Sequence, residues 1–208
     1  MKDELYHIIS GKKPVSFGTT IQAIACYLRE SEKASSTAKN KKYHTKQEKT
    51  CLEEYISQKF FWIDNLDFSQ YVSEGAEQKV YLKNGKSVIK LNDAIYYNSW
   101  EDYLHNLLLH NYFFPDTAYE LLGFTKDEDI LYAVVKQPFV TITTTTDLEQ
   151  VKIFLSQNGF RNVRNNDYYN SELGIILEDL HDENVLTQNG ILYFIDTVFY
   201  LTDDFWKK

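Results

Sequence analysis

Apolar residues recur at helical spacing in the first sixty positions of the chain. In residues 19–32, TTIQAIACYLRESE, they return at steps of three and four, which predicts a helix with one buried face, and Thr19 or Thr20 is suited to cap its start. A second helix is predicted over residues 46–59. The intervening residues 33–49 carry six lysines and one acidic residue, which indicates an exposed basic connector.

From Trp62 onward the pattern changes to the alternation that is typical of strands. Residues 68–92 alternate apolar and polar side chains, and Asn84-Gly85 suits a tight hairpin, so we expect three antiparallel strands. The turn between the first two should span Ser73 to Glu77. A helix is then predicted from Ser99, its cap, to Tyr112, and Pro115 should end it.

The second half of the chain alternates further strands with one helix. Strands are predicted over 119–124 and 130–140, and a helix over 147–157. Two more strands should follow, over 174–179 and 191–199. Strands and helices that do not alternate regularly predict an α+β protein.

Composition and charge narrow the class of protein. A chain of 208 residues with 43% hydrophobic and 15% aromatic residues can bury a substantial core. No stretch approaches the roughly 20 apolar residues of a membrane span, and the opening residues lack a secretory signal, so we expect a cytoplasmic protein without membrane contact. Cys26 and Cys51 are expected as reduced thiols. The net charge of −8 makes nucleic acid an unlikely partner, although the basic connector keeps that alternative open.

The segment 179–186, DLHDENVL, carries the clearest chemical pattern. Asp179 leads Asn184 by five residues on a loop between two strands, and Asp196 follows twelve residues later at the end of an apolar run. A hairpin at Asn189-Gly190 would fold the chain back, so Asn184 and Asp196 can meet at one metal ion. Phosphoryl transfer needs such oxygen ligands and a carboxylate beside the attacking hydroxyl.

A lysine that suits a phosphate site lies upstream. Lys90 ends the run VIK on the third predicted strand, where an ammonium group can hold phosphates as a point charge. The turn before it contains one glycine, and the backbone amides of Gly75, Ala76 and Glu77 are candidates to contact phosphate oxygens.

These residues resemble the protein-kinase-like superfamily, and especially the small kinase domains of polyvalent proteins of phages and mobile elements. DLHDENVL also looks like the DLHPGN loop of aminoglycoside and choline kinases. The resemblance covers roughly Phe68 to Tyr200. It implies a reduced two-lobed kinase fold, with a helical extension over 1–65, an N-lobe and hinge over 66–140, and a C-lobe over 141–208.

The resemblance also implies roles for single residues. Lys90 would bind ATP phosphates, Asp179 would be the catalytic base, and Asn184 and Asp196 would bind Mg²⁺. The hinge backbone from 137 to 140 would bind adenine, which makes Gln137 and Phe139 candidate nucleotide-binding residues. Kinases pair the strand lysine with a glutamate. Three residues compete for that position by spacing, and Glu101 is favoured over Asp102 and His105.

The chain also departs from the kinase pattern. Leu177-Glu178-Asp179 replaces His-Arg-Asp, and Asp196-Thr197-Val198 replaces Asp-Phe-Gly. Twelve residues of the sequence follow Asp196, so we expect no activation segment that presents a peptide. Two hypotheses remain: an ATP-dependent phosphotransferase with an unknown protein or small-molecule acceptor, and a pseudokinase that regulates a partner through its helical extension. A third, weaker one makes the N-terminal region an interaction domain.

Overall fold

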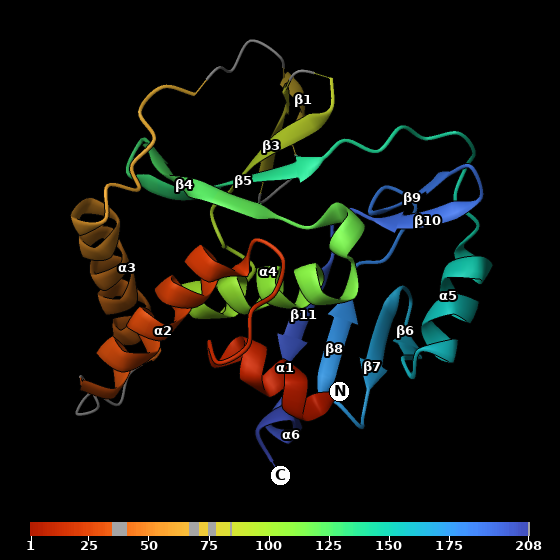
Figure 1. Cartoon of the computed structure of the whole chain (residues 1–208), viewed down its shortest axis with the longest axis horizontal. Coiled ribbons are helices and arrows are strands. Elements are labelled where there is room, and N and C mark those ends of the chain that lie inside the picture. The colour runs from red at the N-terminus through yellow and green to blue at the C-terminus, as the bar shows by residue number, and fades with distance from the viewer. Residues whose placement is uncertain (35–40, 67–70, 75–77, 84, 208) are drawn as a thin grey trace.

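The computed structural model describes residues 1–34, 41–66, 71–74, 78–83 and 85–207, and it combines helices with antiparallel sheets (Figure 1). The helices are α1 (Lys2–Ile9), α2 (Gly18–Ala34), α3 (Lys41–Gln58), α4 (Trp100–Phe113), the 3-10 turn η1 (Pro115–Thr117), α5 (Leu148–Gln157) and α6 (Asp203–Trp206). The strands are β1 (Tyr71–Glu74), β2 (Gln78–Lys83), β3 (Ser87–Asn92), β4 (Glu120–Asp127), β5 (Ile130–Pro138), β6 (Arg161–Arg164), β7 (Asp167–Asn170), β8 (Ile175–Glu178), β9 (Val185–Gln188), β10 (Ile191–Phe194) and β11 (Val198–Leu201). The α+β prediction is confirmed.

Five strands form an antiparallel sheet in the order β1-β2-β3-β5-β4. Every residue of the central strand β3 is buried, because β2 and β5 flank it and other elements cover its faces. The predicted hairpin between β2 and β3 is present, and Gly85 adopts a φ of +67° there, while Asn84 lies outside the described residues. Strand β1 continues to Glu74, so the predicted turn from Ser73 begins later than expected.

Helix α4 lies against this sheet at the centre of the molecule (Figure 1). Ser99 caps it as predicted, since its side-chain oxygen accepts a hydrogen bond from the Asp102 N–H (3.0 Å). Glu48 of α3 adds a second cap, accepting from the N–H groups of Trp100 and Glu101 at 3.0 Å each. Helices α1 and α2 and strand β11 also contact α4, so this helix is buried on most of its surface.

The N-terminal helices share the main core and differ from prediction in their starts. Helix α2 begins at Gly18, so Thr19 and Thr20 lie inside its first turn and do not precede it. Helix α3 begins at Lys41 and takes in residues assigned to the basic connector, because lysine favours helix as well as solvent. Ile24 and Ile56 are fully buried in the cluster that also contains the apolar side chains of α4. The extension is therefore packed as part of the same core.

The C-terminal third contains a four-stranded sheet, β11-β8-β7-β6, and the hairpin β9-β10. Asn189 and Gly190 form the predicted turn of that hairpin, with φ angles of +51° and +78°. The single strand expected over 191–199 is wrong, because β10 ends at Phe194 and β11 starts at Val198. Asp196 therefore lies in a break between two strands that belong to different sheets.

Two general expectations can be compared with this fold. Cys26 and Cys51 are both free thiols, as predicted. Across the residues that the structure describes, every helix is too short or too polar to cross a lipid bilayer.

Candidate functional site

Lys90 projects from the central strand β3 into the interior. Only 4% of the residue is exposed, and its Nζ donates a hydrogen bond to the Ile195 carbonyl (2.9 Å). The same Nζ lies 3.6 Å from Asp196 Oδ2 and 5.4 Å from the ring centroid of Tyr119. A buried ammonium group requires such partners, because burial without them is costly. The strand thus holds a positive charge directly beside Asp196.

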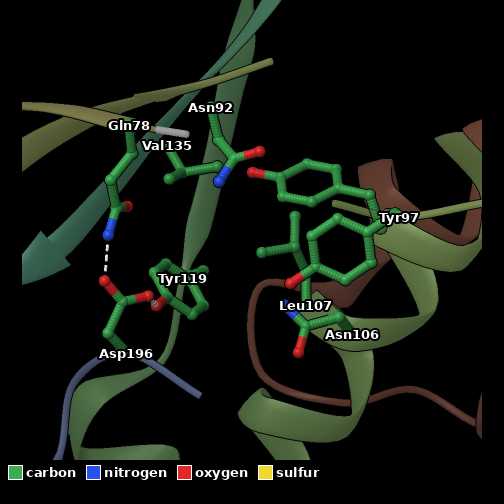
Figure 2. A pocket seen from close by; sticks show the side chains of 9 residues that line it. Gln78, Asn92, Tyr97, Asn106, Leu107, Tyr119, Val135 and Asp196 are labelled. Carbon is green, nitrogen blue, oxygen red and sulfur yellow. Dashed lines mark hydrogen bonds between the residues drawn. The ribbon is translucent and has the colours of Figure 1, made fainter. Parts of the chain in front are cut away.

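Asp196 occupies the break between β10 and β11 and joins several elements. Gln78 at the start of β2 donates a hydrogen bond from Nε2 to Asp196 Oδ2 (Figure 2). The hydroxyl of Tyr119 donates to the Ile195 carbonyl (2.8 Å) and lies 3.5 Å from Asp196 Oδ1. The N–H groups of Ile195 and Asp196 both bond to the Asn184 carbonyl, at 2.9 and 3.3 Å. This pair of backbone bonds breaks the strand and fixes Asp196 beside the loop that contains Asn184.

The loop from Asp179 to Asn184 is closed by its own side chains. Asn184 Nδ2 donates to the Asp179 carbonyl (2.8 Å) and to Asp179 Oδ2 (3.0 Å). His181 Nδ1 accepts from the Glu183 N–H (3.3 Å), which leaves Nε2 to face Asp179 Oδ1 at 3.3 Å. Asp179 has a φ of +64°, and 59% of its side chain is exposed. The loop therefore presents a carboxylate to solvent in a strained, internally bonded conformation.

A buried histidine fixes the residue after Asp196. His110 of α4 is completely buried, with Nδ1 2.7 Å from Thr197 Oγ1 and Nε2 3.0 Å from the Thr117 carbonyl. Burial, assisted by the nearby charge of Lys90, lowers the pKa of His110 to about 3. The neutral ring donates to Thr117 and accepts from the Thr197 hydroxyl. It thereby ties the Asp196 segment to helix α4.

The predicted adenine-binding residues lie at the end of β5. Gln137 pairs with Val88 of β3, and its buried side chain donates to the Thr117 carbonyl (2.7 Å). Phe139 is 43% exposed, and its N–H donates to the Lys86 carbonyl (2.9 Å). Gly75, Ala76 and Glu77, predicted to contact phosphates, lie outside the described residues.

The structure corrects the expected partner of Lys90. Glu101 accepts a hydrogen bond from Arg29 Nε of α2 (2.8 Å) and lies 3.3 Å from His105 Nε2. Burial alone would raise the pKa of Glu101, but His105 and Arg29 together hold it below its usual value. Glu101 lies in the first turn of α4 on the side facing α2, so the carboxylate beside Lys90 comes from Asp196 instead.

Most of the residues that surround Asp196 are polar, and sequence reasoning did not identify them as neighbours of Asp196. They line a cavity of about 10 Å³, room for about one water molecule, between the sheet and α4. Figure 2 labels most of them, and the full set comprises Gln78, Asn92, Tyr97, Tyr103, Asn106, Leu107, Tyr119, Val135 and Asp196. Asn106 had a visible signal, because a buried asparagine within an apolar helix needs a partner; its Oδ1 accepts from the Phe199 N–H (2.9 Å).

The oxygen donors at this site suit magnesium. The Asp196 carboxylate and the Asn184 side-chain oxygen are hard ligands, which Mg²⁺ prefers together with phosphate oxygens. In the described part of the chain, no group of three or more His, Cys, Asp or Glu residues is placed to hold a metal ion.

A lysine on a central strand, facing an aspartate beside an Asp/Asn loop, is the arrangement of kinase-like proteins. Residues 45–203 match the Kinase-PolyVal family, described as a serine/threonine/tyrosine kinase found in polyvalent proteins. The match spans most of the chain, and the protein belongs to this family. It begins inside α3, earlier than the resemblance predicted from the sequence. The comparisons with curated proteins and with solved structures found no match.

Proposed function

We propose that this protein is a phosphotransferase that uses ATP and Mg²⁺. The observation that carries the proposal is a series of contacts among four residues: Lys90 Nζ lies 3.6 Å from Asp196, the Asp196 N–H donates to the backbone carbonyl of Asn184, and the Asn184 side chain bonds Asp179. A lysine, two metal-ligand candidates and an exposed carboxylate are the groups that phosphoryl transfer requires. Family membership supports the same activity.

Each residue has a role in this proposal. Lys90 binds the α and β phosphates of ATP, the hinge backbone from 137 to 140 binds adenine, and the amides of 75–77 contact phosphate oxygens. Asn184 and Asp196 hold Mg²⁺, which neutralises phosphate charge when bound. Asp179, the most exposed of these side chains, orients the acceptor hydroxyl and receives its proton.

The proposed architecture is a reduced two-lobed kinase. The five-stranded sheet with α4 corresponds to the N-lobe over 66–140, and the smaller sheets with α5 to the C-lobe over 141–208. The first 65 residues are the helical extension. The link from β5 to α5, residues 139–147, is drawn as a long connection in Figure 1, which supports the hinge expected over 137–140.

Transfer of radiolabelled phosphate from ATP tests this function. Wild-type protein should label itself or an added protein or small-molecule acceptor, and D179N should reduce the rate at least about 100-fold. The matched control is D182N, which removes another acidic side chain of the same loop and should retain activity. Equal rates for wild type and D179N would reject Asp179 as the base, and no labelling by wild type would reject the enzyme.

A pseudokinase is the second candidate, because the Asp196 carboxylate is already engaged by Gln78 and Lys90. In addition, Glu101 of α4 is held by Arg29 of the helical extension, so a change at α4 would reach the N-terminal helices. Calorimetry separates the candidates. Magnesium-dependent ATP binding without transfer favours a nucleotide-binding module that regulates a partner, and absence of binding contradicts both.

A further inference from the structure

The β6–β7 hairpin carries most of the arginine of an acidic protein. Strand β6 contains Arg161 and Arg164, two of the three arginines in a chain of net charge −8. All four β6 residues are exposed, and β6 is the outermost strand of its sheet. Its outer edge therefore presents cations and one unpaired side of a strand to solvent.

This hairpin is attached directly to the loop that contains Asp179. The Leu180 N–H donates to the Asn166 carbonyl (3.2 Å), and the Asp179 N–H donates to Asp167 Oδ1 (3.3 Å). Asn162 stiffens the tip, since its Nδ2 donates to the carbonyls of Asn165 (2.7 Å) and Asp167 (3.1 Å). The arginine-bearing strand thus lies at a fixed position relative to the candidate base.

Within the part of the chain that the structure describes, the guanidinium groups of the two arginines do not stabilise the fold through hydrogen bonds or ion pairs. Neither guanidinium forms a hydrogen bond or ion pair with a described residue, whereas Arg29 bonds both Glu101 and the Ile9 carbonyl. Val163 between them is 60% exposed and adds an apolar contact surface. An edge with two unengaged guanidinium groups is suited to bind carboxylates in a bidentate manner.

Acidic and basic residues lie close together on the hairpin. On its catalytic-loop side, burial and the neighbouring Asp167 and Asp179 raise the pKa of Glu178, which marks an acidic environment. Arg161 and Arg164 lie on the neighbouring strand, where Arg164 is paired with Asp167 and Arg161 with Tyr169. Arg161 and Arg164 can attract the acidic flanks of a bound segment, while the uncharged hydroxyl of that segment lies beside Asp179.

We propose that the outer edge of β6 docks an extended acidic segment of the phosphoacceptor, with Arg161 and Arg164 binding its carboxylates. Backbone pairing with β6 would align the segment as an added strand, and its Ser, Thr or Tyr hydroxyl would lie toward Asp179. The proposal rests on the phosphotransferase function and specifies its acceptor. A nucleic acid fits less well, because two arginines supply few of the phosphate contacts on which nucleic-acid binding depends.

Fluorescence polarisation with labelled peptides tests the docking without relying on catalysis. The probes are peptides with one central serine flanked by glutamates, and the same peptides with every glutamate replaced by glutamine. R161Q/R164Q should weaken binding of the glutamate peptide about tenfold and leave the glutamine peptide unchanged. K12Q/K59Q, which removes two exposed lysines on other elements, is the charge-matched control and should bind like wild type. Thermal unfolding checks that all variants are folded.

Phosphate transfer to the same peptides then separates the two proposals. The docking proposal is overturned if wild type binds both peptides equally, or if R161Q/R164Q binds the glutamate peptide as well as wild type does. If arginine-dependent binding persists while no peptide is phosphorylated, the docking surface stands and the phosphotransferase proposal fails. A raised KM with unchanged kcat in R161Q/R164Q would place the arginines in docking and not in the chemical step.

Discussion

The two halves of the candidate site differ in burial. Lys90 is 4% exposed and contacts Ile195 and Asp196, in the break between β10 and β11, and Tyr119, just before β4. Asp179, in contrast, has 59% of its side chain exposed, and its partners lie within its own loop or on the β6–β7 hairpin. Stability and function should therefore be coupled on the Lys90 side and separable on the Asp179 side.

This difference matches the demands of the proposed reaction. The same nucleotide binds in every reaction cycle. A preformed, buried arrangement of charges lowers the free-energy cost of ordering the site around it. An acceptor must enter and leave beside an accessible carboxylate. The buried half can be tested by stability measurements even before a substrate is known.

The largest loss of stability is expected for D196A. Removing this carboxylate takes away the negative charge 3.6 Å from the buried Lys90 Nζ, which should cost about 3 kcal/mol of unfolding free energy. The double variant K90M/D196A should recover part of that loss, because methionine needs no partner. Urea denaturation measures both, and equal stabilities of the single and double variants would contradict a buried ion pair.

The next largest effect is expected for H110Q. At pH 7 this variant should lose about 2 kcal/mol of unfolding free energy, because Thr197 and Thr117 lose a buried hydrogen-bond partner. The folded pKa of His110, about 3, lies below the ordinary 6.5, so on acidification the unfolded chain binds a proton that the folded protein refuses. Wild type should therefore lose stability relative to H110Q as the pH falls from 6.5 toward 3, by about 1 kcal/mol per pH unit. Thermal melts at several pH values provide the comparison, and parallel curves would rule out a neutral buried His110.

Glu48 of α3, which caps the start of α4, should change stability with pH in the opposite direction from His110. Burial raises its pKa to about 7, against the effect of its hydrogen bonds to the N–H groups of Glu101 and Trp100. Between pH 4.5 and 7 the folded protein holds a proton that the unfolded chain has released, so stability attributable to Glu48 increases as the pH falls. Relative to E48Q, wild type should gain about 1 kcal/mol between pH 7.5 and 6. A gain in the other direction would mean that the ionised carboxylate caps α4 better than the neutral one.

The sequence predicted most of the structure wherever a local pattern determines the fold. Ser99 identified its helix start by capping chemistry, and Asn189-Gly190 identified a turn by its positive φ angles. The hairpin between β2 and β3 was likewise predicted from its turn, whereas the pairing of β3 with β5 was not. Lys90 and the loop residues were selected for types and spacing that suit phosphate chemistry, and the structure places Lys90 beside Asp196 and Asn184 beside Asp179.

Long-range contacts account for what the sequence could not predict. The apolar run 191–199 read as one strand, yet two backbone bonds to Asn184 break it at Asp196. Glu101 has the spacing of a lysine partner, but Arg29, 72 residues earlier, engages it. Gln78 reaches Asp196 across 118 residues. No periodicity encodes such pairings, because they depend on how helices and sheets pack.

The smallest stability effect should accompany D179N. This side chain is 59% exposed and bonds mainly to Asn184 and His181, so asparagine should change the unfolding free energy by less than about 0.5 kcal/mol. The same substitution removes the proposed base, and phosphate transfer should fall while urea denaturation stays unchanged. A stability loss as large as that of D196A would show that the exposed loop is as integral to the fold as the buried ion pair, and the contrast between the two halves of the site would disappear.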